Sequence, residues 1–104
     1  MMTQVEKVDY IMKKSCTYLG VTPDELKPRS RPKSELLMGR RFIIKTLADH
    51  TTLSFDTVAN LLGYKGHSNI LYHFNVINDD LSDKTYGSDK IKRLYKEYLD
   101  YLNL

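Results

Sequence analysis

The chain has 104 residues, which is enough for one domain with a single hydrophobic core, and its 41% hydrophobic and 28% charged residues are typical of a folded soluble protein. One cysteine and three histidines exclude an internal disulfide and a cysteine-based zinc cluster, and the apolar runs are too short to span a bilayer. With neither a secretory signal nor a GxxxxGK[ST] or GxGxxG motif, we expect a cytoplasmic protein with no metal and no nucleotide cofactor.

The first third of the chain contains two helix start signals and then a basic loop. Apolar residues between Thr3 and Leu19 recur every three or four positions, and Thr3 with Glu6 has the form of a capping box. The expected inward face of this helix is Val5, Val8, Ile11, Met12, Cys16 and Leu19. Residues 22–26 open a second, short helix. Residues 27–33, which read KPRSRPK, contain two prolines and therefore form an exposed loop.

Helical patterns fill the rest of the chain. We expect a helix capped by Ser34 that runs to about His50, a helix over residues 55–62, a helix over 67–80 and a last helix over 89–102, with a polar loop at 82–88. Their expected inward residues include Val58, Leu61 and Leu62, then Ile70, Leu71, Phe74 and Ile77. No strand alternation is convincing, so the sequence predicts an all-α fold of five to six helices in one domain, 1–104.

Two of these helices, joined by a turn that contains glycine, have the form of a helix-turn-helix over residues 54–80. Positive charge is concentrated just before this motif. Residues 27–45 hold seven basic residues against one acidic, a net charge of +6, while the remaining chain holds nine basic and twelve acidic, a net charge of −3. This asymmetry favours phosphate binding over a merely solvated face, although the overall charge of +3 by itself selects no partner.

The candidate DNA contacts fall into two groups. An extended, proline-held loop suits insertion of an arginine into a narrow minor groove, and Arg40 and Arg41 are expected to hold phosphates. Polar residues at the start of the second helix are placed where a recognition helix meets base edges, and Asn69 could pair with adenine. Glycine, serine and asparagine are also common helix caps, so a capping role remains the alternative there. The candidates are Arg29, Arg31, Lys33, Arg40, Arg41, Lys65, His67, Ser68 and Asn69.

From Val5 to about Ile77 the sequence resembles the C-terminal DNA-binding domain of the bacterial replication initiator DnaA. The segments that carry the resemblance are LGVTPDELKPRSR and RRFIIKTLADHTTLSFDTVANLLGYKGHSNILYH. The second ends on a variant of the family signature Gly-Gly-Arg-Asp-His-Thr-Thr-Val-Leu-His. The matching positions are Glu25, Leu26, Arg40, Thr51, Ser54, Phe55, Val58, Gly63, Lys65 for arginine, His67, Ile70 and Leu71.

The resemblance implies a Trp-repressor- and DnaA-like helix-turn-helix with an extra C-terminal helix, double-stranded DNA as the partner, and a role in replication initiation or its regulation. It also implies that Arg31, or next Arg29, enters the minor groove. Gly66 stands where the signature has its acidic residue, and Ser68 and Asn69 replace its two threonines, which implies an altered target sequence or weaker specificity. The family's ATPase module has no counterpart in these residues. We expect a free-standing DNA-binding protein, with a fragment of a longer protein as the alternative.

Two other classes of function are weighed against DNA binding. The tyrosines of the last helix, Tyr95, Tyr98 and Tyr101, could form a protein-interaction or oligomerisation surface, or could instead pack that helix on the core. A transcriptional regulator would use the same DNA-binding mode. An enzyme is not expected, because the sequence shows no arrangement of a nucleophile with a base.

Overall fold

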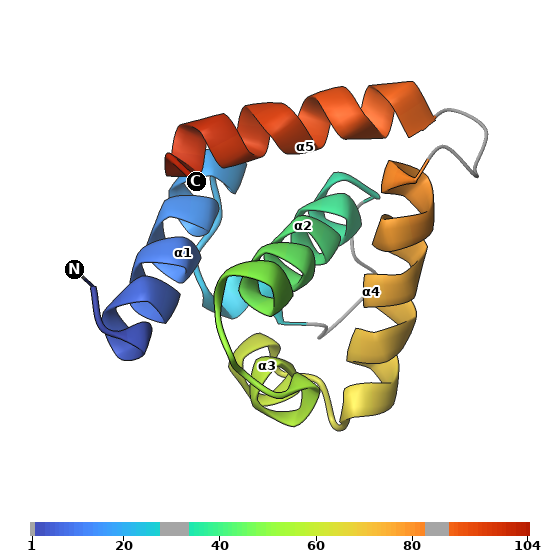
Figure 1. Ribbon diagram of the computed structural model, residues 1–104. Helices are drawn as coiled ribbons and strands as arrows, with labels where there is room; N and C mark the ends of the chain where they lie inside the picture. The colour runs from blue at the N-terminus through green and yellow to red at the C-terminus, as the bar shows by residue number, and fades with distance from the viewer. Residues whose placement is uncertain (1, 28–33, 83–87) are drawn as a thin grey trace.

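The computed structural model describes residues 2–27, 34–82 and 88–104, and these form an all-α fold (Figure 1). Five α-helices and one short 3-10 helix follow one another in the described residues. They are α1 (Gln4–Leu19), the 3-10 helix η1 (Asp24–Leu26), α2 (Ser34–His50), α3 (Phe55–Leu62), α4 (His67–Leu81) and α5 (Ser88–Leu102). None of the helices in this described part is both long enough and apolar enough to cross a membrane.

Several helix ends lie where the sequence places its caps, whereas Ser34, expected to precede α2 as its cap, belongs to that helix. Thr3 and Glu6 form the complete capping box at the start of α1, and the Ser54 hydroxyl accepts a hydrogen bond from the Thr57 backbone at the start of α3. Gly63 ends α3 in the left-handed conformation, with φ of 79°, and its N–H donates to carbonyls of the last turn. This cap turns the chain sharply toward α4.

The central helix of the bundle is α2, which packs against α1, α3 and α4 (Figure 1). Helix α5 runs along the top of the view, against α1 near its end and α4 near its start. Gly39 allows α1 and α2 to approach closely, because a Cβ at that position would lie 2.7 Å from a methyl carbon of Leu19. The glycine that interrupts the apolar pattern of α2 therefore has a packing role.

One core unites all of these helices. Its buried residues are Ile11 and Cys16 of α1, Leu26 of η1, Phe42, Ile43, Ile44 and Leu47 of α2, Val58, Ala59 and Leu62 of α3, Ile70 and Ile77 of α4, and Tyr95, Tyr98 and Leu102 of α5. Polar atoms inside it are paired. The hydroxyls of Ser15 and Tyr98 lie 2.7 Å apart, and the Tyr10 hydroxyl donates to the Leu102 carbonyl oxygen at 2.8 Å.

Three residues expected to face inward lie at the surface instead. Val5 is 79% exposed, Leu61 38% and Leu71 41%. Val5 lies in the first turn of α1. Leu71 is next to exposed Tyr72 on the outer side of α4. The apolar stripe in the sequence is therefore wider than the surface that the bundle covers.

Candidate nucleic-acid interface

Helices α3 and α4 are joined by residues 63–66 and pack against each other. Lys65 is exposed in the connection, and His67, Ser68 and Asn69 are exposed in the first turn of α4. Gly66 precedes that turn and contributes no side-chain cap, and the turn carries no acidic residue. The first N–H groups of α4 thus have no side-chain cap, unlike those of α1 and α3. The structure brings these four sequence candidates together at one helix end.

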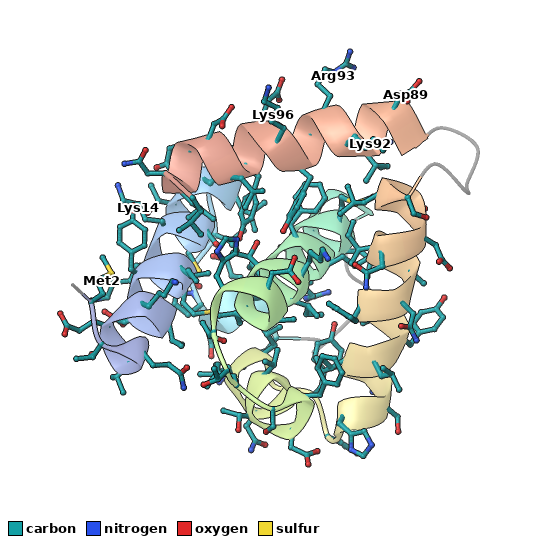
Figure 2. The ribbon with its side chains drawn as sticks, in the orientation of Figure 1. Met2, Lys14, Asp89, Lys92, Arg93 and Lys96 are labelled. Atoms are coloured by element: carbon teal, nitrogen blue, oxygen red, sulfur yellow. The ribbon has the colours of Figure 1, made fainter. Side chains whose placement is uncertain are left out.

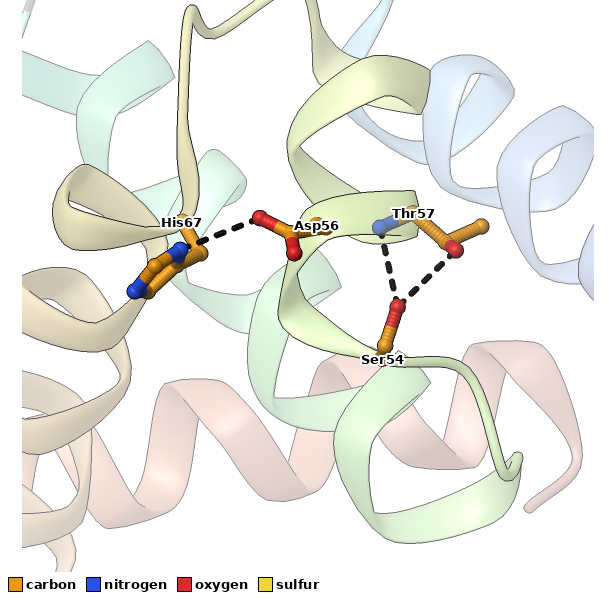
Figure 3. Close-up of polar contacts among 4 residues, drawn as sticks. All are labelled: Ser54, Asp56, Thr57 and His67. Carbon is orange, nitrogen blue, oxygen red and sulfur yellow. Dashed lines mark hydrogen bonds and ion pairs between the residues drawn. The ribbon is translucent and has the colours of Figure 1, made fainter.

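His67 is linked to the preceding helix by Asp56, which the sequence analysis did not select. The Asp56 Oδ1 atom lies 3.0 Å from His67 Nδ1, and both side chains are largely exposed (Figure 3). A carboxylate can only accept a hydrogen bond, so Nδ1 carries the proton and Nε2 is left for an outside partner. The contact joins residues eleven positions apart in different helices, and no local pattern in the sequence signals it.

The position of Asp56 is itself set by local structure. It lies in the first turn of α3, where a negative charge is favourable, directly after the Ser54 cap. Ser54 Oγ also lies 3.0 Å from the Thr57 hydroxyl, so the start of α3 is fixed by two contacts of one side chain (Figure 3). The acidic group beside His67 therefore extends from an ordered helix start rather than from a loop.

Arg41 faces α4, although it belongs to α2. Its Nε atom donates to Nδ1 of His73 at 3.2 Å, and both residues are half-buried. The His73 ring also contacts the rings of Tyr64 and Tyr72, with centroid separations of 5.7 and 5.3 Å. Burial lowers the pKa of His73, and the neighbouring positive charges of Arg41 and Arg40 lower it further. Burial likewise raises the pKa of the Tyr64 phenol, with a partial opposing effect from the two arginines.

The sequence predicts that Arg40 holds a DNA phosphate, but the structure does not place this side chain where it could do so. The residue is only 2% exposed to solvent. Its guanidinium group points inward, where Nε donates to the carbonyl oxygen of Leu26 and Nη2 to that of Lys27 at 3.2 Å. These carbonyls end the 3-10 helix just before the basic loop. Adjacent residues on a helix point about 100° apart, so Arg40 and Arg41 cannot both face the same surface.

The remaining candidates of the basic loop, Arg29, Arg31 and Lys33, lie outside the described residues. The structure adds a stretch of exposed surface on α4 that the sequence analysis did not single out. Tyr72 is 60% exposed, and Asn75 is exposed one turn further along. Both extend the face that begins with Ser68, because residues three and four apart are neighbours on a helix.

The tyrosines of α5 serve the core more than the surface. Tyr95 and Tyr98 are buried, and their rings contact Phe42 of α2 at 5.1 and 5.5 Å. Tyr101, 42% exposed, lies against Tyr18. Asp89, Arg93 and Lys96 point outward from the opposite side of α5, and this surface is far from the start of α4 (Figures 1 and 2). Two of the three tyrosines considered for an interaction surface are therefore used within the domain.

Comparison with curated proteins finds one relative that is similar in sequence. The chain is 28% identical over 89 residues to the chromosomal replication initiator protein DnaA of Chlorobaculum tepidum. The match covers 86% of this chain and 18% of that protein, so the chain is similar to a small part of DnaA only. No family model matches the chain. No solved structure matches it either.

Proposed function

We propose that the chain binds double-stranded DNA sequence-specifically through its helix-turn-helix and its basic loop, and that it acts in replication initiation or its regulation. The observation that carries this proposal is the exposed first turn of α4, which has no side-chain cap and where His67, Ser68 and Asn69 lie next to Lys65 of the connection. Side chains at the start of a recognition helix are the ones that reach base edges in the major groove. The similarity to part of DnaA supports the same conclusion independently of the geometry.

Each part of the proposed interface has a separate task. Residues of the first turn of α4 read bases, with Asn69 suited to adenine and the Nε2 atom of His67 available beside it. Lys65 and Arg41 hold phosphates, and Arg29, Arg31 and Lys33 supply the loop that reaches the adjacent minor groove. Phosphate contacts set the affinity and base contacts set the sequence preference. The proposed activity is binding, with no catalytic step.

The test is a selection of bound sequences from a random duplex pool, followed by titrations of the selected duplex against salt. Lys65→Ala should reduce the magnitude of the salt slope by about 1 and weaken binding to all duplexes similarly. Asn69→Ala should change the preferred sequence, at a cost of about 1–3 kcal/mol for the original site. No enrichment of any sequence over the starting pool would contradict specific binding.

Lys96→Ala is the matched control for Lys65→Ala. It removes the same charge from the outer face of α5, which points away from the proposed interface (Figure 2). Its salt slope should equal that of the unaltered protein. Equal effects of the two substitutions would show that binding depends on overall charge and would contradict the proposed interface. Selected sequences that occur in promoters rather than in replication origins would favour the transcriptional alternative.

A further inference from the structure

We propose that His73 is a positioning residue for DNA binding, which in its neutral form holds the Arg41 side chain at the edge of α4. The inference rests on the proposed function. It adds to the proposed interface a residue that lies outside the first turn of α4. His73 lies six residues beyond His67 on α4, and it contacts the guanidinium group of Arg41, which belongs to α2.

The direction of the hydrogen bond follows from chemistry alone. Arginine has no acceptor, so Arg41 Nε donates and His73 Nδ1 must accept. An accepting Nδ1 has no proton, so the ring is the neutral tautomer that carries its proton on Nε2. Protonation would turn Nδ1 into a donor and abolish the contact. Within the described part of the chain, no further hydrogen bond or ion pair of Arg41 occurs, which leaves its terminal nitrogens for an outside anion.

The surroundings of His73 keep the ring in place and disfavour its charged form. In the part of the chain that the structure describes, the charged groups that face it are the guanidinium groups of Arg41 and Arg40, both on α2. The titratable groups that face it are the phenols of Tyr64, from the connection before α4, and of Tyr72, on α4 itself. Half-burial and two positive neighbours lower the pKa of His73, so the ring is neutral at pH 7.5.

This contact has an effect on affinity because a free arginine side chain loses rotamer freedom when it binds. Holding Arg41 before DNA arrives reduces that loss, and one immobilised side chain corresponds to roughly a 2- to 10-fold change in Kd. His73→Phe keeps the ring but removes the acceptor, and should weaken DNA binding by that factor at pH 7.5. His73→Asn places an amide oxygen near the Nδ1 position and cannot be protonated, so it should bind as tightly as the unaltered protein.

The experiment combines a binding cycle with a pH profile. Kd for the selected duplex is measured for the unaltered protein, His73→Phe, His73→Asn, Arg41→Ala and the double variant of His73→Phe with Arg41→Ala, at pH 7.5 and at a pH below the lowered pKa of His73. The effect of His73→Phe should vanish in the Arg41→Ala background. Relative to His73→Asn, which shares every other titrating group, the unaltered protein should lose affinity at the lower pH, where His73 is protonated. The imidazole nitrogen shifts in the free protein should show an unprotonated Nδ1 at pH 7.5.

The failures of the two proposals can be told apart. If the unaltered protein binds no duplex, the proposed function fails, and the use of Arg41 for DNA fails with it. If it binds, but His73→Phe costs the same factor with and without Arg41, His73 acts through the fold and this inference alone is overturned. A proton on Nδ1 in the free protein would overturn it as well. Urea unfolding of each variant at both pH values shows which Kd values refer to folded protein.

Discussion

Replacing Arg40 by alanine separates a structural arginine from a DNA-binding one. The substitution removes two hydrogen bonds from a guanidinium group to main-chain carbonyls, in a residue that is 2% exposed. Hydrogen bonds from charged groups contribute about 1.5–3 kcal/mol each, and buried carbonyls left without a donor cost a similar amount. We therefore expect Arg40→Ala to lower the free energy of unfolding by about 3–5 kcal/mol, a large part of the stability of a small domain.

The assay is urea unfolding together with a salt titration of duplex binding under conditions in which each variant is folded. Arg41→Ala is the matched control, because it removes the same charge from the next residue. It should lower stability by less than about 1 kcal/mol but reduce the magnitude of the salt slope by about 1. Arg40→Ala should leave the salt slope unchanged.

Arg40→Lys refines the same test. It keeps the positive charge but replaces the planar fork by a single ammonium group, which cannot reproduce two guanidinium contacts of fixed geometry. Stability should fall although the net charge is unchanged. The reasoning is refuted if Arg40→Ala costs less than about 1 kcal/mol and reduces the salt slope as Arg41→Ala does, because Arg40 would then be a phosphate contact.

Three further substitutions or conditions test other parts of the structure. Gly63→Ala should lower the stability measured in urea more than Gly20→Ala does. Both glycines have positive φ, where an alanine costs about 1–2 kcal/mol. Only at position 63 would the added Cβ also lie close to another side chain, 2.8 Å from a carbon of Lys27. Equal losses would contradict the close contact. Burial raises the pKa of Tyr98 to about 12, whereas a tyrosine in the unfolded chain loses its proton near pH 10. The free energy of unfolding should therefore fall as the pH rises above about 10. Tyr98→Phe should make that fall less steep. Asp56→Ala should alter base preference where His67 binds and change stability by less than about 0.5 kcal/mol, since the pair is exposed; an unchanged selected sequence would argue against its orienting role.

The sequence predicts the helices well because their ends carry local chemical signals. Thr3, Ser54 and Gly63 act on backbone groups within four residues, so their effect can be inferred without knowing the fold. The burial of each side chain is less predictable. Leu61 and Leu71 match the apolar periodicity, yet they are exposed, because a helix in a small bundle is covered only where another helix lies against it.

The candidate site divides in the same way between local and distant information. The first turn of α4 was predicted, because polar residues after a glycine turn are visible in the sequence. Asp56 beside His67 and His73 beside Arg41 were not, since these contacts join residues 11 and 32 positions apart. Arg40 was assigned to DNA because a count of charges treats adjacent arginines alike, whereas a helix turns one of them toward the core.

Folding also reduces the positive charge that the 27–45 segment can offer to DNA. Arg40 is buried, Lys45 pairs with Asp49 at 2.9 Å while its ammonium lies over the Phe74 ring, and Lys27 pairs with an aspartate of η1 at 3.5 Å. The other candidates of the segment are Arg41 and three residues that lie outside the described part of the chain, Arg29, Arg31 and Lys33. With Lys65 they make five candidate phosphate contacts, for which the salt slope of duplex binding should be about −4.5.

If all seven basic residues of the segment and Lys65 bound phosphates, the slope would be about −7. The two values are far enough apart for a titration between low and moderate salt to decide between them. A slope near −7 would mean that Lys27, Arg40 and Lys45 exchange their internal partners for DNA, and that the bound fold differs around η1 and α2. A slope near −4.5 would mean that these three side chains keep their internal partners while the others contact the phosphates.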